Sequence, residues 1–148
     1  MFSKTCQYAI QATFYVALNG SSNKPVGLSA TATSQNIPSH FLGKIMQQLV
    51  KKQVLSSIKG PNGGFYLAKP ADKIRIIEIF DIFDGIESLE KCVLGFDACS
   101  SIRPCPLHDS YMPVKKATFK LLQGKTIKDF IEDIKAEKSY VAYFGWKN

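Results

Sequence analysis

Apolar residues recur at helical spacing through the opening part of the chain. Between Lys4 and Leu18 they follow three- and four-residue steps, and Asn19-Gly20 ends the pattern, which predicts a first helix. A short second helix is predicted from Ser29, as its N-cap, to about Gln35. Asn36 can then adopt the left-handed conformation at the helix end, and Pro38 prevents continuation. The chain is therefore predicted to open with two helices separated by a loop.

The most regular pattern in the chain comes next, in a third helix that Ser39 is predicted to cap. One face of this helix is apolar and carries Phe41, Leu42, Ile45, Met46, Leu49 and Val50. The opposite face is polar and cationic and carries His40, Gly43, Lys44, Gln47, Gln48 and Lys51. Two helices joined by a tight turn, the second with such an outer face, are typical of a helix-turn-helix. A helical hairpin whose polar face is only solvated is the alternative.

A turn-rich segment after this helix favours the DNA-binding interpretation. Two short strand patterns, 54–58 and 65–67, flank the sequence Lys59-Gly60-Pro61-Asn62-Gly63-Gly64, whose residues tolerate positive φ. A β-hairpin directly after the second helix of a helix-turn-helix is a wing. Its tip carries Lys59 and little side-chain bulk, so its backbone N–H groups can approach phosphates or enter a minor groove. The predicted fold is mainly α with a small β-hairpin, a winged helix-turn-helix.

The second half of the chain is predicted to be helical around an irregular loop. Its predicted elements are a helix over Ile74–Phe83 closed by Asp84-Gly85, an irregular stretch over Ser88–Ser110, a helix over Tyr111–Leu122 ended by Gly124, and a last short helix that begins at a capping box of Thr126 and Asp129. The aromatic tail, Tyr140–Trp146, is expected to pack on the body or against a partner. Three regions result: a DNA-binding region over 1–86, a cysteine loop over 87–110, and the long helix, last helix and tail over 111–148.

Charge is distributed unevenly along the 148 residues. The chain carries nineteen Lys and Arg against twelve Asp and Glu, yet residues 1–71 contain seven lysines and no acidic residue. The first carboxylate is Asp72, and from there the charges balance. A half-chain without carboxylates suits a polyanion, because no negative side chain repels phosphates. A generally basic, solvated surface is the alternative, but the complete absence of acidic residues favours nucleic acid.

Several function classes lose support from composition and motifs. No run approaches the ~20 apolar residues that a membrane span needs. The N-terminus opens into a helical pattern without the apolar core and cleavage site of a signal peptide, so we expect a cytoplasmic protein. No Ser/His/Asp or paired-carboxylate arrangement stands out. The sequence therefore predicts a protein that is not an enzyme and has no membrane or small-molecule substrate as a partner.

The chain resembles the Rrf family of bacterial winged-helix regulators. The segments that carry the resemblance are Tyr8-Ala9-Ile10, Val16-Ala17-Leu18, Phe41–Leu55, Lys59-Gly60, Gly63–Pro70 and Ile79–Gly85. It covers about the first 86 residues closely and the rest more loosely, and the Gly-Gly wing followed by Leu-Ala-Lys-Pro is its most specific part. The resemblance implies a transcriptional regulator, in most cases a repressor, that binds double-stranded DNA at a near-palindromic operator. It also implies a homodimer with the long helix, here about Tyr111–Leu122, in the interface.

The DNA-binding residues expected from these patterns lie on the third helix and the wing. They are Ser39, His40, Lys44, Gln47, Gln48, Lys51, Lys59, Gly60, Gly63 and Gly64. Base contacts are usually made near the start of a recognition helix, where Ser39, His40 and Lys44 lie, although His40 can instead cap or pack locally. The iron–sulfur members of the family carry an acidic residue on this helix. Gly43 occupies the matching position, so their operator preference does not carry over.

Three of the four cysteines lie in the predicted loop. Cys92, Cys99 and Cys105 are separated by six and five intervening residues. Thiolates that converge from one loop can ligate a metal or an iron–sulfur cluster, because soft sulfur matches iron. Zinc and three unligated thiols are the alternatives. The resemblance extends to the cluster loop of the family, and it therefore implies an iron–sulfur cluster.

The fourth ligand and the type of cluster stay open. His108 stands three residues after Cys105, the position of the histidine ligand in iron–sulfur members, although it can also be a loop histidine that ligates nothing. Three Cys and one His favour a 2Fe–2S cluster, and the nitric-oxide-sensing branch of the family permits 4Fe–4S. That branch uses an acidic residue of the partner's first helix, at a position that Gln7 occupies here. Cys6 lies on the apolar stripe and is predicted to be core.

Two regulatory functions follow from these patterns. In the first, a cysteine-ligated cluster senses redox state, nitric oxide or iron–sulfur status. In the second, the winged helix has no cluster and is controlled by a protein partner or by thiol oxidation. A small redox enzyme or electron carrier is a third possibility, which is disfavoured because an electron carrier needs no basic wing.

Overall fold

The computed structural model describes residues 2–97 and 99–136 of the chain. Its elements are α1 (Lys4–Asn19), α2 (Leu28–Gln35), α3 (Ser39–Lys51), β1 (Leu55–Ile58), β2 (Gly64–Leu67), a 3-10 turn (Ala71–Lys73), α4 (Ile76–Phe83), α5 (Glu87–Glu90), α6 (His108–Gly124) and α7 (Ile127–Lys135). The predicted fold, mainly helical with one antiparallel hairpin, is confirmed. No helix within the described ranges is both long and apolar enough to cross a bilayer. The predicted aromatic tail, Tyr140–Trp146, lies outside the described residues.

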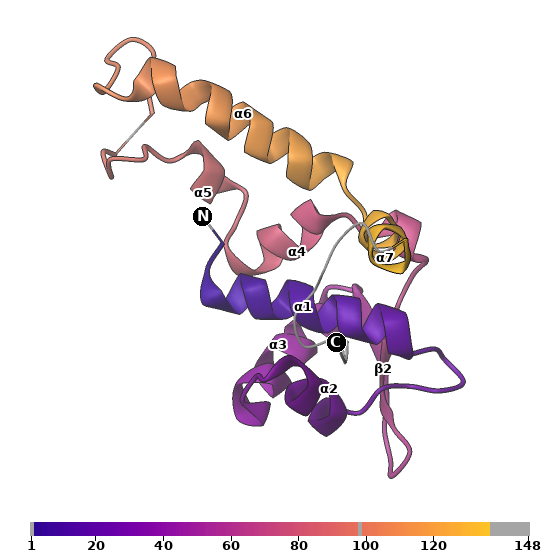
Figure 1. Cartoon of the computed structure of the whole chain (residues 1–148). Helices are drawn as coiled ribbons and strands as arrows, with labels where there is room; N and C mark the ends of the chain where they lie inside the picture. Colours follow the sequence, from indigo (N-terminus) through magenta and orange to yellow (C-terminus); the bar gives the residue numbers. More distant parts are fainter. Residues whose placement is uncertain (1, 98, 137–148) are drawn as a thin grey trace.

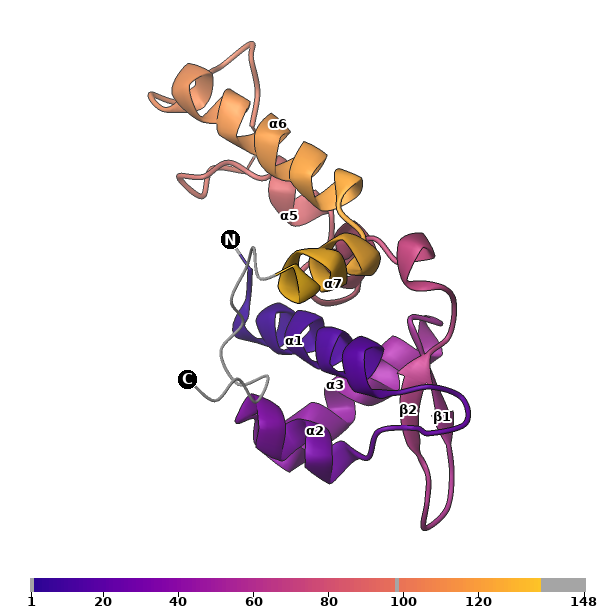
Figure 2. The same ribbon diagram turned by 45° about the vertical axis from the view of Figure 1, so that its right-hand side comes forward.

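The elements form a compact body with a projection at each end (Figures 1 and 2). The body contains α1, α2, α3, α4 and α7, with α1 in contact with each of the other four. The β1–β2 hairpin projects from one end of the body. At the opposite end α6 extends outward beside α5 and the loop that joins them. We call residues 87–124 the cysteine arm, because they carry Cys92, Cys99 and Cys105.

Facing apolar stripes of α1 and α3 build the core of the body. The fully or almost fully buried side chains of these two helices are Cys6, Ala9, Ala12, Thr13, Val16, Leu42, Ile45, Met46 and Leu49. Burial of one such Leu, Ile or Met side chain stabilises the fold by about 1.5–3 kcal/mol relative to exposure. The apolar spacing seen in the sequence therefore fixes which face of α3 turns inward, and its polar face is left outside.

A third strand-like segment anchors the hairpin to the body. The backbone of Val26 exchanges two hydrogen bonds with Phe65 of β2, with N···O distances of 2.9 and 2.8 Å. Within the hairpin, Leu55 pairs with Leu67 and Ile58 with Gly64. The sequence patterns did not identify the role of Val26, because a single bridging residue has no alternation to detect. Strand β2 is therefore hydrogen-bonded along both of its edges, to β1 on one side and to Val26 on the other.

Two predicted helix caps are wrong. Gly27, not Ser29, precedes α2, and the N–H of Thr31 donates to the Gly27 carbonyl at 3.1 Å. Pro38, not Ser39, is the N-cap of α3, and its carbonyl accepts the first helical hydrogen bonds. Proline favours a helix start because its φ is already fixed near the helical value. Ser39 is thus the first helical residue, and its side chain is exposed.

Three boundaries in the second half also differ from prediction. Helix α4 begins at Ile76, since the carbonyl of Ile74 instead accepts a hydrogen bond at 2.9 Å from the N–H of Ile127, the first residue of α7. Helix α5 (Glu87–Glu90) occupies the first residues of the stretch that was predicted to be irregular from Ser88 onward. Helix α6 begins at His108, one turn before the predicted start, and contains Pro113. Because the Tyr111 N–H donates to the Leu107 carbonyl at 2.8 Å, the helix is established before the proline is reached.

Cys6 is a core residue, as predicted, and its thiol is held neutral. The side chain is fully buried on α1. Burial raises the pKa of the Cys6 thiol to about 12, and the negative charge of Asp84 and a hydrogen bond to it act in the same direction. Asp84 also accepts a hydrogen bond from the Ser3 N–H at 2.8 Å, so it ties the start of α1 to the end of α4.

Stability is expected to fall at alkaline pH because of this thiol. The pKa of Cys6 is raised on folding, so its contribution is fully present below the ordinary value of 9.0 and is lost as pH rises toward about 12. Over that window the unfolded chain releases a proton that the folded chain keeps, which costs about 1.4 kcal/mol per pH unit. Urea unfolding at pH 8.0, 9.5 and 10.5 is expected to show this slope in the parent and not in Cys6→Ala. Parallel curves for the two proteins would contradict the assignment.

Candidate functional site

The polar face of α3 is presented to solvent. All six of its predicted DNA-binding residues have exposed side chains: Ser39, His40, Lys44, Gln47, Gln48 and Lys51. The helix is held in this orientation by Leu42, Ile45 and Leu49, which are buried on its other face. The helix therefore offers hydrogen-bonding and cationic groups on one side, as reading of a DNA major groove requires.

The wing ends in a tight turn built from Gly60 to Gly63. The Gly63 N–H donates to the Gly60 carbonyl at 2.9 Å, and Gly60 adopts a φ of 111°. Gly63 and Gly64 do not adopt positive φ; they are required by space instead. A Cβ at Gly63 would overlap the Ile58 carbonyl, and one at Gly64 would overlap the Val26 carbonyl. Lys59 is exposed beside this turn.

Helix α3 and the wing border a common groove. This hollow of about 470 Å³ is lined by Leu28, Gln47, Val50, Ser57, Ile58, Lys59, Gly60, Gly63, Gly64 and Phe65. It brings five of the predicted DNA-binding residues, from two separate elements, to one surface. Lys69 at the base of the wing has a different role, since its ammonium forms an ion pair with Glu78 of α4 at 2.6 Å. The cations left for a ligand at this surface therefore include Lys44, Lys51 and Lys59.

The predicted metal ligands gather on the cysteine arm as two pairs. The Cys99 Sγ lies 3.5 Å from the His108 Nδ1, and Cys105 is near enough to Cys92 to contribute to the lowering of the pKa of the Cys92 thiol. Within residues 2–97 and 99–136, no three His, Cys, Asp or Glu side chains are grouped closely enough to hold one metal ion. The structure thus places all four donors in the same arm, paired two by two.

The sulfur of Cys92 is prepared for negative charge. Hydrogen bonding from the Leu94 N–H lowers the pKa of the Cys92 thiol most, with smaller contributions in the same direction from the Phe96 N–H, Cys105 and the Lys115 charge, while burial opposes them. Gly95, with a φ of 78°, makes this turn possible, and its N–H donates to the Cys92 carbonyl at 3.0 Å. Backbone N–H groups aimed at a thiolate are an arrangement that tunes sulfur ligands of iron–sulfur clusters.

Comparison with known proteins identifies the family. A family model, Rrf2, described as an iron-dependent transcriptional regulator, matches residues 2–133. The chain belongs to the Rrf2 family. A protein of Aquifex aeolicus named as an HTH-type transcriptional regulator is 39% identical to this Rrf2 chain over 133 residues, which cover 88% of this chain and 91% of that protein. The HTH-type transcriptional regulator IscR of Klebsiella pneumoniae is 28% identical over 127 residues, covering 86% and 77%.

Solved structures agree on the fold of this Rrf2 protein. CymR, the global cysteine regulator of B. subtilis, superimposes with a TM-score of 0.75 at 18% identity, covering 89% of this chain and 96% of that one. IscR of T. potens gives a TM-score of 0.71 at 23% identity, covering 99% and 96%. The winged-helix fold and the predicted family are confirmed. Because the relatives are transcriptional regulators, the expectation that the chain is not an enzyme is confirmed as well.

The cysteine arm of the Rrf2 chain also exposes a large apolar surface. Eight large hydrophobic side chains of the arm are at least 38% exposed: Val93, Leu94, Phe96, Ile102, Leu107, Val114, Phe119 and Leu121. Monomeric proteins rarely leave so many apolar groups of one region in water. Outside the arm, the large hydrophobic side chain of the described residues that is exposed to a similar extent is Ile58 of the wing. The apolar surface is therefore concentrated on the arm, at the opposite end of the molecule from the wing (Figure 2).

Proposed function

We propose that this Rrf2 regulator is a cytoplasmic homodimer that represses transcription through an operator affinity set by an iron–sulfur cluster on the cysteine arm. The observation that supports the cluster most directly is that one arm carries Cys92, Cys99, Cys105 and His108, with the Cys99 Sγ 3.5 Å from the His108 Nδ1. The proposal also keeps the three regions that the sequence suggests: residues 1–86 bind DNA, residues 87–110 hold the cluster, and residues 111–148 contain the dimerisation helix, the last helix and the tail.

The donor set matches a cluster in its chemistry. Cys92, Cys99, Cys105 and His108 would hold it, with three soft thiolates and one imidazole, a combination that favours 2Fe–2S and leaves 4Fe–4S open. When bound, such a cluster supplies a redox-active iron centre that oxidants and diatomic gases can reach. The loop over 91–107 contains no helix or strand among its described residues, so the two donor pairs can move together without unfolding a regular element.

The protein's own contacts offer a path from the arm to the DNA-binding face. Helix α4 leads into the arm and contacts α1, α3 and α6. At the end of α4, Asp84 accepts the hydrogen bond from Ser3 that fixes the start of α1, and Gly85 turns the chain into the arm with a φ of 74°. A change in the position of the arm can therefore act on α1 and α3 through one rigid helix. Such coupling changes operator affinity only if DNA prefers one arrangement.

The second copy in the proposed dimer covers the exposed apolar side chains of α6. Val114, Phe119 and Leu121 lie along this helix with at least 38% of their surface in water. A two-fold dimer buries the same surface on both copies and places two recognition helices for a near-palindromic site. Sedimentation of the reduced protein measures this directly.

DNA binding is expected to depend steeply on salt and on individual lysines. Each phosphate contact contributes a slope of about −0.9 to the log–log dependence of affinity on salt. Lys51→Ala and Lys59→Ala are each expected to weaken specific and non-specific duplexes alike and to reduce the slope by about one unit per bound subunit. Lys128→Ala, on α7, removes the same charge outside the proposed interface and is expected to change neither. Affinity that stays constant across a salt series would argue against the interface.

A visible spectrum tests whether the protein binds a cluster, and an operator titration tests whether the cluster changes DNA affinity. Protein purified without oxygen is expected to be coloured, with visible charge-transfer bands, and to contain iron and sulfide in stoichiometric amounts. Operator titration before and after removal of the cluster is expected to give different affinities. A colourless protein that retains full operator binding after anaerobic reconstitution would reject the cluster.

The second candidate is a regulator without a cluster, controlled by a protein partner or by thiol oxidation. Two observations favour it. No three of the donors among the described residues are grouped closely enough to hold one metal ion. The pKa of the Cys92 thiol is lowered, with Cys105 among the causes, and a thiolate is the form that oxidants attack. Colourless protein whose operator affinity changes after peroxide treatment and recovers with a reductant would support this candidate.

A further inference from the structure

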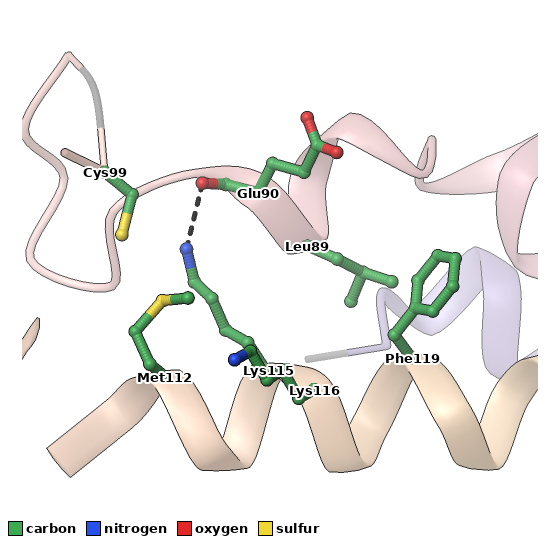
Figure 3. Close-up of a pocket in the computed structure, with 7 residues that line it drawn as sticks. All are labelled: Leu89, Glu90, Cys99, Met112, Lys115, Lys116 and Phe119. Carbon is green, nitrogen blue, oxygen red and sulfur yellow. Dashed lines mark hydrogen bonds between the residues drawn. The ribbon is translucent and has the colours of Figure 1, made fainter. Parts of the chain in front are cut away.

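The cysteine loop is joined to α6 by a lysine that the sequence patterns did not single out. The Lys115 Nζ donates to the backbone carbonyl of Glu90 at 2.9 Å, across 25 residues of sequence. Figure 3 shows the side chain rising from α6 to this carbonyl, at the end of α5. Glu90 precedes Cys92 by two residues, so the hydrogen bond holds the segment from which that cysteine projects.

Lys115 stands between two hollows that separate the arm's helix from its loop. A cavity of about 530 Å³ is lined by Leu89, Glu90, Cys99, Met112, Lys115, Lys116 and Phe119. A second, of about 260 Å³, is lined by residues of α4, α5, the loop and α6, among them Leu89, Cys92 and Lys115. Lys115 and Leu89 line both. Where packing leaves space on each side, a polar contact across the gap sets the distance between loop and helix.

We propose that Lys115 is a positioning residue that fixes the loop carrying Cys92 against α6. A lysine suits this role, because its ammonium donates up to three hydrogen bonds at the end of a long apolar stem. The carbonyl of Glu90 is the last of α5, where helical carbonyls lack a partner within the helix. The ammonium supplies that partner. In the middle of the loop, the contact of Cys99 with His108 provides a second link, to the start of α6.

The neighbouring lysine provides a matched control. Lys116 lies on the same helix and lines the same cavity, but its side chain is exposed and forms no hydrogen bond or ion pair with the described residues. Lys115→Met and Lys116→Met each remove one ammonium and keep a long apolar side chain. Lys115→Arg keeps a charged donor and tests for rescue.

Hydrogen exchange of the reduced, metal-free full chain measures the position of the loop without any cluster. Amides of residues 88–96 are expected to exchange about fivefold faster in Lys115→Met, the effect of one lost charge-assisted hydrogen bond in partial contact with water. Lys116→Met and Lys115→Arg are expected to match the parent, and amides of the wing are expected to be unchanged in all variants. Equal exchange in Lys115→Met and the parent, or equal acceleration in Lys115→Met and Lys116→Met, would overturn the proposal.

The consequence for the cluster rests on the function proposed above and is measured separately. After anaerobic reconstitution, loss of visible absorbance to a chelator is expected to be several-fold faster in Lys115→Met than in Lys116→Met, with Lys115→Arg near the parent. If the parent itself forms no chromophore, the cluster is rejected, while the exchange experiment still decides the role of Lys115. If the parent is coloured and all variants lose the cluster at the same rate, Lys115 has no positioning role toward the cluster.

Discussion

Cys99→Ala is expected to abolish stable retention of an iron–sulfur cluster. The proposed donors are three thiolates and one imidazole, and each thiolate supplies a covalent, charge-neutralising bond to iron that water cannot replace. Cys99 is also the partner of His108 at 3.5 Å, so its loss removes one ligand and releases a second from its position. Cys92→Ala and Cys105→Ala are expected to have the same all-or-none effect, because the remaining thiols cannot hold the cluster alone.

Two further variants make this experiment specific. His108→Ala is expected to be milder and to change the stability or potential of the cluster, since an imidazole is the most replaceable of the four ligands. Cys6→Ala is expected to keep the cluster, because the Cys6 side chain is fully buried in the body, on α1. Each variant is reconstituted without oxygen and compared by visible spectrum, iron content and operator titration. Retention of a full cluster by Cys99→Ala together with its loss in Cys6→Ala would show that the ligand assignment is wrong.

Local regularities made much of the fold predictable. The apolar stripe of α3 identifies both its buried face and its exposed one, because one helix repeats the same geometry for 13 residues. Asn36 ends α2 in the left-handed conformation with a φ of 53°, as predicted. The capping box at α7 also forms, with the Thr126 N–H donating to Asp129 at 2.7 Å and the Asp129 N–H donating to Thr126 at 3.2 Å. These features depend on residues within one turn of each other.

Most of the structural features that the sequence patterns did not predict depend on contacts between residues far apart in the chain. The bridge between Val26 and Phe65 joins segments 39 positions apart and consists only of backbone hydrogen bonds, which leave no side-chain signature. The apolar positions between Tyr111 and Leu122 did not reveal the first turn of α6, which begins at His108 and whose residues His108, Asp109 and Ser110 are polar. Spacing selected the cysteines but did not reveal their pairing, because an irregular loop has no fixed geometry.

Gly64→Ala is expected to damage both the stability of the protein and the position of the wing. A single added methyl group at this site meets the backbone of Val26 and lies 2.9 Å from the Gly27 N, and neither group is a flexible side chain that can move aside. To relieve this overlap, β2 has to move away from Val26. That movement strains the two hydrogen bonds between Val26 and Phe65. Overpacking of this kind costs about 1–3 kcal/mol, and the bridge adds to it.

The control is the same substitution where space is available. A Cβ at Gly124, in the last turn of α6, has no atom within 4 Å, and alanine favours a helix more than glycine does, so Gly124→Ala is expected to be neutral or slightly stabilising. Urea unfolding is expected to show a lower midpoint for Gly64→Ala alone. Operator affinity is expected to fall in the same variant under conditions where circular dichroism shows it folded, because Lys59 and Gly60 are carried by the displaced hairpin. Normal midpoint and normal affinity in Gly64→Ala would mean that the wing tolerates a side chain against Val26 and is not held by that contact.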